Sequence, residues 1–175
     1  MTDEELFAAF MKGDDASLGA LARKHEPALL GLARGLLHGR GEHAADVVQS
    51  AWLRVIRYRH TFSGRSTFKT WMYRIVINEA RAVSTKIARM KSQDRAFEPT
   101  QRDDTADAFE IGAVRAALDE LTQGQRETLL LCYHGGISHA QAAAILQIPL
   151  GTLKSRLNAA LVALRARLDM EVVTS

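Results

Sequence analysis

The segment 62–74 interleaves aromatic rings with arginine and lysine, a combination suited to single-stranded nucleic acid. Flat rings stack on unpaired bases, each stack contributing about 1–3 kcal/mol, while cations hold the neighbouring phosphates. The loop around Gly64 could close over an extruded base. Phe68, Trp71 and Met72 would fall on the apolar side of a helix, where a place in the core is the more common outcome.

Positive charge is concentrated around this segment. The whole chain carries a net charge of only +3, yet residues 52–91 hold ten basic residues against one acidic residue. Residues 1–51 hold five basic and eight acidic residues. The middle of the chain therefore has the profile of a polyanion-binding surface, and the first part is suited to a different partner.

Other polar patterns do not form a reaction centre. We find no nucleophile beside a base, so an enzyme is not expected. Cys132, His134 and His139 could lie near one another, but a fourth ligand is missing and we expect no metal. The glycines at 31, 35, 39 and 41 follow no strand, which argues against a phosphate-binding loop. The sequence therefore predicts no cofactor.

Hydropathy and cysteine usage indicate a cytoplasmic protein. No stretch approaches the roughly 20 apolar residues that cross a bilayer, so we expect no membrane insertion. Three of the first five residues are acidic, unlike the basic start of a signal peptide. The single cysteine, Cys132, excludes an internal disulfide.

Helical periodicity runs through the chain, and no segment alternates like a strand, so the sequence predicts an all-α fold. Thr2 and Glu5 could form a capping box for the first helix. Ser66 is a candidate N-cap for a long helix that ends near Met90. Residues 1–92 would form the first small helical domain.

An acidic, apolar-poor stretch follows. Residues 93–108 include four aspartates and one glutamate, with Pro99, which predicts a flexible acidic linker between two domains. The alternative is a loop packed within one domain, although unstructured loops of this length are uncommon there.

Residues 109–175 would form a second helical domain that contains a helix-turn-helix. Capping boxes at Thr122 with Gln125 and at Ser138 with Gln141 predict two helix starts, and residues 147–149 separate a short helix, 140–146, from a long one. The amino end of the last helix would present side chains to phosphates and base edges: Thr152, Lys154, Ser155, Arg156 and Asn158. An ordinary αα-hairpin is the alternative.

Four motifs in order carry a family resemblance: Asp46-Val47-Val48-Gln49, a run from Ser66 through Thr70-Trp71 to Ala80, the stretch 121–126, and Ile148-Pro149 through Leu157. Over nearly the whole length the chain resembles extracytoplasmic-function (ECF) sigma factors. The resemblance implies a second conserved sigma region in 1–92, a fourth in 109–175, and a linker that threads toward the polymerase active-site cleft.

The resemblance also implies partners and site residues. The partners would be core RNA polymerase, through its β′ clamp and β flap, promoter DNA and an anti-sigma factor. The clamp-binding residues would be Asp46, Gln49, Trp52, Leu53 and Val55. Recognition and melting of the −10 element would use Arg59, Phe62, Arg65, Ser66, Lys69, Arg74, Asn78 and Arg81. Recognition of the −35 element would use the five residues of the last helix named above.

The chain departs from the family pattern at five positions. Ser50 and Ala82 stand where acids are usual, Gln147 where the turn has glycine, and Ala159 and Leu161 where the recognition helix has arginines. Losing two cations should weaken DNA attraction and its salt dependence. Two other functions therefore stay open: a sigma mimic that occupies an anti-sigma factor, and a dimeric helix-turn-helix repressor.

Overall fold

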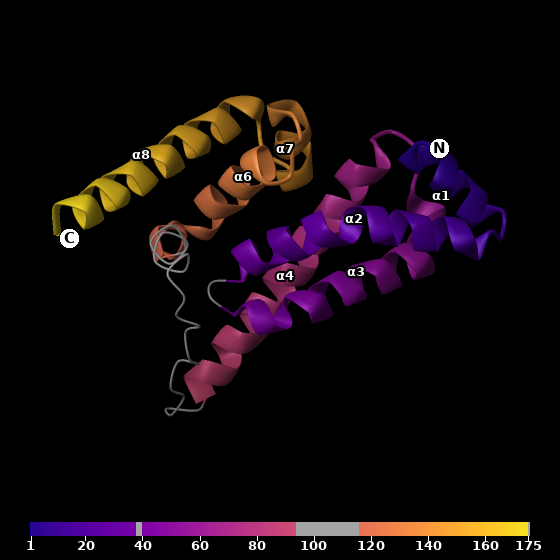
Figure 1. Cartoon of the computed structure of the whole chain (residues 1–175), viewed down its shortest axis with the longest axis horizontal. Coiled ribbons are helices and arrows are strands. Elements are labelled where there is room, and N and C mark those ends of the chain that lie inside the picture. Colours follow the sequence, from indigo (N-terminus) through magenta and orange to yellow (C-terminus); the bar gives the residue numbers. More distant parts are fainter. Residues whose placement is uncertain (38–39, 94–115, 175) are drawn as a thin grey trace.

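The computed structural model describes residues 1–37, 40–93 and 116–174, and this part of the chain is helical without strands (Figure 1). The all-α prediction is confirmed. The expected linker, except Gln93, and residues 111–115 of an expected helix lie outside the described residues. The helices are α1 (Asp3–Met11), α2 (Asp15–Leu36), η1 (Gly41–His43), α3 (Ala44–Tyr58), η2 (Arg59–Thr61), α4 (Phe68–Gln93), α6 (Gln123–Tyr133), α7 (His139–Leu146) and α8 (Leu150–Thr174).

The amino-terminal domain packs α1 to α4 around a core of leucine, valine and aromatic side chains. The predicted Thr2–Glu5 capping box is present and opens α1. α2 continues through Pro27 as one helix of 22 residues. Leu21, Leu29 and Leu32 of α2 are fully buried, so packing on both sides of Pro27 keeps the helix continuous.

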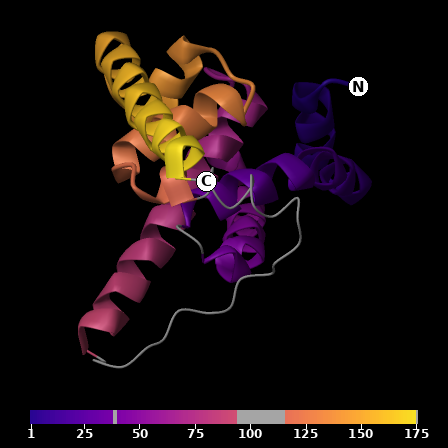
Figure 2. The same cartoon turned by 60° about the vertical axis from the view of Figure 1, so that its left-hand side comes forward.

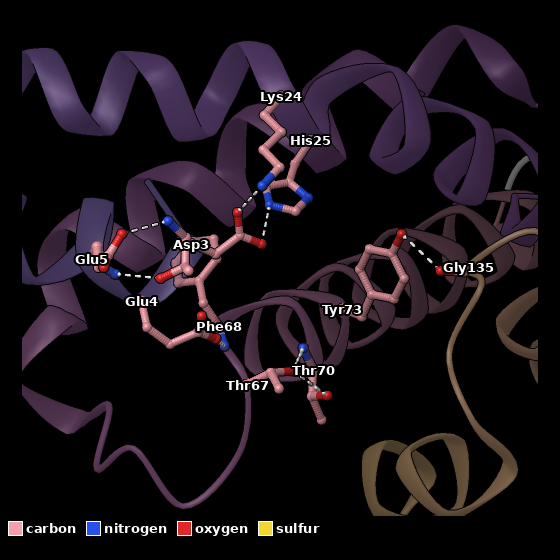
Figure 3. A network of polar contacts seen from close by, with 11 residues as sticks. Asp3, Glu4, Glu5, Lys24, His25, Thr67, Phe68, Thr70, Tyr73 and Gly135 are labelled. Carbon is pink, nitrogen blue, oxygen red and sulfur yellow. Dashed lines mark hydrogen bonds and ion pairs between the residues drawn. The ribbon is translucent and has the colours of Figure 1, made fainter.

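The start of α4 is fixed by two side chains. Thr67 accepts a hydrogen bond at Oγ1 from the backbone N–H of Thr70, so Thr67 is the N-cap and the expectation of Ser66 was wrong by one residue. Glu4 of α1 accepts a further bond from the Phe68 N–H at 3.1 Å (Figure 3). These contacts satisfy N–H groups that a helix start leaves without partners, and they position the loop before α4.

Asp3 ties α1 to α2 beside this helix start. Its carboxylate accepts hydrogen bonds from Lys24 at 2.6 Å and from the buried His25 at 2.8 Å (Figure 3). Burial alone would raise the pKa of Asp3, but the hydrogen bond from Lys24 together with the charge and hydrogen bond of His25 outweighs it and lowers that pKa.

The carboxy-terminal domain contains the predicted helix-turn-helix, formed by α7 and α8. The capping boxes of Thr122 with Gln125 and of Ser138 with Gln141 are both present. Gln147 ends α7 with φ of 56°, a left-handed conformation that favours glycine. A glycine at this position would adopt the same conformation without strain. α8 is the long helix expected after residues 147–149, and it extends from Leu150 to Thr174.

The buried guanidinium of Arg126 stabilises the first described residues of this domain. Arg126 is 1% exposed and donates from Nε and Nη2 to the Leu118 carbonyl and from Nη2 to the Leu121 carbonyl. Burial lowers the pKa of Arg126, and the nearby carboxylates of Asp119 and Glu127 act in the opposite direction. The arginine thereby supplies donors to carbonyls where the helical turn 116–119 ends.

The two domains lie against each other. Figures 1 and 2 place α6 beside α2 and α7 beside α4, and residues of both domains belong to one hydrophobic cluster. Its carboxy-terminal members include Leu131, Ile137 and Ile145, packed in the same cluster as Tyr73 and Ile77 of α4. A second, smaller cluster lies within the carboxy-terminal domain. The described part of the chain therefore has one shared core and one local core.

Candidate nucleic-acid and polymerase interfaces

The outer face of α3 is an exposed surface of mixed character, which we call the α3 face. Asp46 and Gln49 are exposed, Leu53 is 60% exposed, and Trp52 is half-buried. Val55 is fully buried in the core and offers no surface to a partner, so it is removed from the candidate contacts. Its place follows from the helical period, which turns Val55 inward with Val48.

The aromatic residues around the loop before α4 form one cluster that reaches the surface. Phe68 is fully buried, and Phe7 packs against its ring at 5.2 Å between centroids. Phe62 and Trp71 are half-buried, with centroids 5.2 Å apart, and Phe62 also meets Phe7 edge-on at 79°. The prediction that Phe68 is core is confirmed. Phe62 is held by this cluster rather than standing free in the loop.

Two cations of α4 face the carboxy-terminal domain. Arg74 donates from Nη2 to the Ala144 carbonyl of α7 at 2.8 Å. Arg81 donates from Nε and Nη2 to the two carboxylate oxygens of Glu127 in α6, at 2.7 and 2.6 Å. Asn78, on the same side of α4, is exposed. We call the surface bearing Arg74, Asn78 and Arg81 the α4 face.

The ion pair between Arg81 and Glu127 is the strongest polar link between the domains that the described residues contain. Its two parallel bonds are the geometry in which guanidinium and carboxylate fit best. The Glu127 side chain is 3% exposed and that of Arg81 is 40% exposed. The hydrogen bond from Glu127 raises the pKa of Arg81, although burial acts in the opposite direction. Arg81 therefore keeps its proton in this contact.

The remaining cations of the predicted −10 surface are less confined. Arg65 and Ser66 are exposed in the loop before α4. Arg59 is exposed, with its guanidinium 5.5 Å from the centre of the Phe10 ring. Lys69 is half-buried, and its ammonium lies 5.6 Å from the centre of the Tyr73 ring. The structure thus separates an exposed loop from the α4 face, whose two arginines are hydrogen-bonded to the carboxy-terminal domain.

The amino end of α8 is mostly exposed. Lys154, Ser155 and Asn158 are exposed and Thr152 is half-buried. Arg156 is half-buried and lies against Gly124 of α6, where a β-carbon would come within 3.2 Å of its guanidinium; the guanidinium therefore faces α6 rather than lying on the outside of α8.

Sequence reasoning missed three features of the contact between the two domains: Glu127, the buried Tyr73, and the glycines of α2. Periodicity could have indicated that Glu127 lies on the inner side of α6, because Leu131 is four residues later and buried. The partner of Glu127 could not be predicted, since Arg81 is 46 residues away in the sequence.

Two further site types find no support in the described part of the chain. No group of three histidine, cysteine or acidic side chains there could hold a metal ion. Burial raises the pKa of Cys132, so its thiol ionises less readily and is a poorer nucleophile or metal ligand. Among the described helices, none is sufficiently long and apolar to span a membrane.

Comparisons with known proteins define the class first. Residues 21–89 match the family described as Sigma-70 region 2, and residues 111–164 match the family Sigma-70, region 4. The chain thus has the two conserved regions of a sigma-70 protein in the expected order.

Individual relatives narrow the class. The chain is 34% identical over 160 residues to the ECF RNA polymerase sigma factor SigM of Mycobacterium tuberculosis, covering 89% of this chain and 79% of that protein. It is 35% identical over 127 residues to the ECF RNA polymerase sigma factor EcfG of Rhodopseudomonas palustris, covering 71% of this chain and 70% of that protein. The chain belongs to the ECF sigma factor family.

Two solved structures have a fold similar to that of this chain. The sigma factor RpoE of Bartonella quintana, crystallised with the anti-sigma factor NepR, is 27% identical with a TM-score of 0.76, covering 86% of this chain and 96% of that chain. CnrH in complex with the cytosolic domain of CnrY is 25% identical with a TM-score of 0.76, and the match covers 96% of this chain and 97% of that chain.

Proposed function

We propose that this ECF sigma factor binds core RNA polymerase and directs it to promoters, with each domain contacting DNA. The observation that carries the proposal is the match of both sigma-70 regions, in order, to a chain whose α3 face and α8 amino end are exposed. Neither domain alone needs to bind tightly, because two contacts tethered to one polymerase raise each other's effective concentration. Its place of action is then the cytoplasm, where the polymerase is.

The α3 face is the proposed docking surface for the β′ clamp. Leu53 is an exposed leucine next to the half-buried Trp52, with the polar Asp46 and Gln49 nearby on the same helix. A large apolar side chain with a polar rim is the usual composition of a binding hot spot. Val55 supports this surface from within the core.

The −10 element is proposed to meet the loop before α4 and the α4 face. The exposed side chains of Arg59, Arg65 and Ser66 would contact the sugar-phosphate backbone of the DNA. The half-buried Phe62 offers a ring edge at the margin of the aromatic cluster. Lys69, Arg74, Asn78 and Arg81 would hold the strand once it is separated.

The −35 element is proposed to meet α8 through Lys154, Ser155 and Asn158, with Thr152 and Arg156 at the margin of the contact. Ala159 and Leu161 are exposed on this helix where the family has arginines. We expect this contact to be weakly dependent on salt, since few cations remain to neutralise phosphates. The β flap is the proposed polymerase contact of this domain.

An anti-sigma factor is the proposed regulatory partner. The two solved relatives named above are complexes with an anti-sigma factor and with the cytosolic domain of CnrY, respectively. Their fold covers most of this chain, which supports a partner of that kind.

The test is run-off transcription with core polymerase on a library of promoters. Replacing both Arg74 and Arg81 with alanine should abolish open-complex formation and leave polymerase binding intact. A matched control replaces Lys12 and Arg23, which are exposed cations of the same domain, with alanine. Retained melting in the first variant would refute the strand-binding assignment. Binding to an anti-sigma factor with no initiation at any promoter would favour a sigma mimic.

A further inference from the structure

The beginning of the loop before α4, residues 62–67, rests against α1. The ring of Phe62 meets the buried ring of Phe7 edge-on, with 5.1 Å between the centroids. Directly before the loop, the Arg59 guanidinium lies 5.5 Å from the centre of the Phe10 ring. Phe7 and Phe10 are both buried residues of α1, so this helix gives the beginning of the loop a fixed surface.

The end of the loop is held by a charged side chain of the same helix. Phe68 is the first residue of α4, and its N–H has no carbonyl acceptor within that helix. The Glu4 carboxylate accepts a hydrogen bond from this N–H at 3.1 Å (Figure 3). Its negative charge also lies at the positive end of the α4 dipole. A glutamine could replace the hydrogen bond but not the charge, whereas an alanine could replace neither.

The middle of the loop is not held in this way. Residues 63–66 are exposed and make no hydrogen bond to the rest of the chain that the structure describes. Gly64 has φ of 69°, a left-handed conformation that costs glycine little. The loop therefore has two anchored ends and a middle that can adapt to a ligand.

α1 is fixed in place without the help of the loop. Its Asp3 is hydrogen-bonded to Lys24 and His25 of α2. The next residue but one, Glu5, belongs to the capping box that closes the first turn. Glu4 lies between these two anchored residues, so its carboxylate extends toward α4 from a backbone that is already held.

We propose that α1 presets the loop before α4 for binding an unpaired base, with Glu4 as a positioning residue that acts through the Phe68 N–H. The proposal rests on the proposed function, because it concerns the same loop. α1 precedes residues 21–89, which match Sigma-70 region 2, so this support comes from outside the matched residues. A loop with anchored ends loses less conformational entropy when a base enters it. Weakening the anchor should therefore slow promoter opening and leave polymerase docking unchanged.

The first experiment follows the anchor in the free chain by amide hydrogen exchange, measured by nuclear magnetic resonance. The Phe68 N–H should be protected in the parent chain, because Glu4 is its acceptor. Glu4→Ala should speed its exchange about tenfold, and Glu4→Gln should retain most of the protection. Exchange at Phe68 that is as fast in the parent chain as in Glu4→Ala would overturn the proposal.

Glu5→Ala is the matched control, because it removes another exposed carboxylate from the same turn of α1. Glu5 accepts a hydrogen bond from the Thr2 N–H, in the cap of its own helix. If fraying of α1 caused the faster exchange at Phe68, Glu5→Ala would produce it as well. We expect little change in Glu5→Ala, and an effect as large as that of Glu4→Ala would overturn the assignment to Glu4.

The second experiment asks whether the anchor serves promoter opening. Holoenzyme is reconstituted with each variant on a promoter from which the parent chain initiates, and the reactivity of unpaired thymines to permanganate gives the rate of opening. Glu4→Ala should lower this rate about fivefold, and Glu4→Gln should keep it near the parent value. The affinity for core polymerase should be the same for the parent chain and both variants.

The outcomes distinguish this proposal from the proposed function. If the parent holoenzyme initiates at no promoter, the proposed function fails and the role of Glu4 in opening fails with it. If the parent initiates and Glu4→Ala opens the promoter at the same rate, the positioning role is overturned while the proposed function stands. Equal slowing by Glu4→Gln and Glu4→Ala would also overturn it, because the charge rather than the bond to Phe68 would then be responsible.

Discussion

The α3 face and the α4 face belong to the same small domain, yet only the α4 face is contacted by the carboxy-terminal domain. Leu53 of α3 is 60% exposed, whereas Arg74 and Arg81 of α4 donate hydrogen bonds to that domain. The surface proposed for polymerase therefore has no partner to displace, whereas DNA on the α4 face has to compete with the acceptors that the two arginines already have.

Chemistry explains why the two faces differ. The α4 face presents guanidinium groups, which any carboxylate within the same chain can satisfy, and tethering makes that internal partner locally concentrated. The α3 face combines an acid, an amide and an apolar side chain, a mixture that Glu127 cannot satisfy. A face built to bind a polyanion is therefore the one more easily occupied from within.

The largest expected effect concerns the hydrophobic core that the two domains share behind the α4 face. Leu131→Ala removes a fully buried side chain from the cluster common to both domains and should cost about 2–5 kcal/mol of unfolding free energy. Both tryptophans, Trp52 and Trp71, lie in the amino-terminal domain, so their fluorescence reports that domain alone. The urea midpoint of this signal should fall.

Leu157→Ala is the control for that measurement, since Leu157 belongs to the core local to the carboxy-terminal domain. It should move the tryptophan midpoint much less. Equal midpoints for the parent chain and for Leu131→Ala would mean that the domains unfold independently, and the contrast between the two faces would then lose its structural basis.

The next effect concerns the open face. Leu53→Glu places a charge in the middle of the α3 face and should weaken core polymerase binding at least tenfold, which is about 1.4 kcal/mol. Because Leu53 is exposed, the melting temperature should hardly change. Met11→Glu, at another exposed apolar side chain, serves as the control in the same affinity measurement. Unchanged affinity for Leu53→Glu would move the docking surface elsewhere.

A smaller effect concerns the link between α1 and α2. Asp3→Asn removes the charge that Lys24 and His25 bind, and should lower stability at pH 7 by about 1 kcal/mol. The pKa of Asp3 is lowered on folding, so its contribution is complete above the ordinary value of 3.8 and is lost as the pH falls through the folded value. Denaturation curves of the two proteins should converge in acid. A gap that persists there would assign the loss to packing.

The smallest effect is expected at the helix-turn-helix. Gln147→Gly relieves a left-handed conformation, and stability should rise by roughly 0.5–1 kcal/mol, because the strain removed exceeds the extra entropy of the unfolded glycine. Thermal unfolding followed by circular dichroism measures this gain. Gln147→Ala, which keeps a β-carbon, should bring none; a gain from both changes would indicate that the glutamine side chain, not the backbone, is unfavourable.

Helix starts were the features best predicted from the sequence. The pairs Thr2 with Glu5, Thr122 with Gln125 and Ser138 with Gln141 form the expected capping boxes, because such caps depend only on residues within one turn. At α4 the sequence analysis named Ser66, but the bond from the Thr70 N–H shows that the next residue, Thr67, is the N-cap.

The state of the candidate site was not predictable in the same way. Arg74 and Arg81 were expected to contact DNA, and nothing near them in the sequence indicates a partner within the chain. Their acceptors, Ala144 and Glu127, belong to the other domain, and only the three-dimensional packing brings them together. The sequence shows that Gly31 and Gly35 are four residues apart, but it does not show that Leu130 and His134 will pack where their β-carbons would be.

Arg126 has a consequence for reading substitutions in related chains. Its planar fork serves two carbonyls at once, those of Leu118 and Leu121, from a position sealed from water. Lysine would match it in charge but has a single ammonium on a flexible stem and could not reproduce the fork. An arginine-to-lysine exchange at this position counts as conservative in substitution tables, but here it would destabilise the domain. Related chains that have lysine there should carry another hydrogen-bond donor nearby.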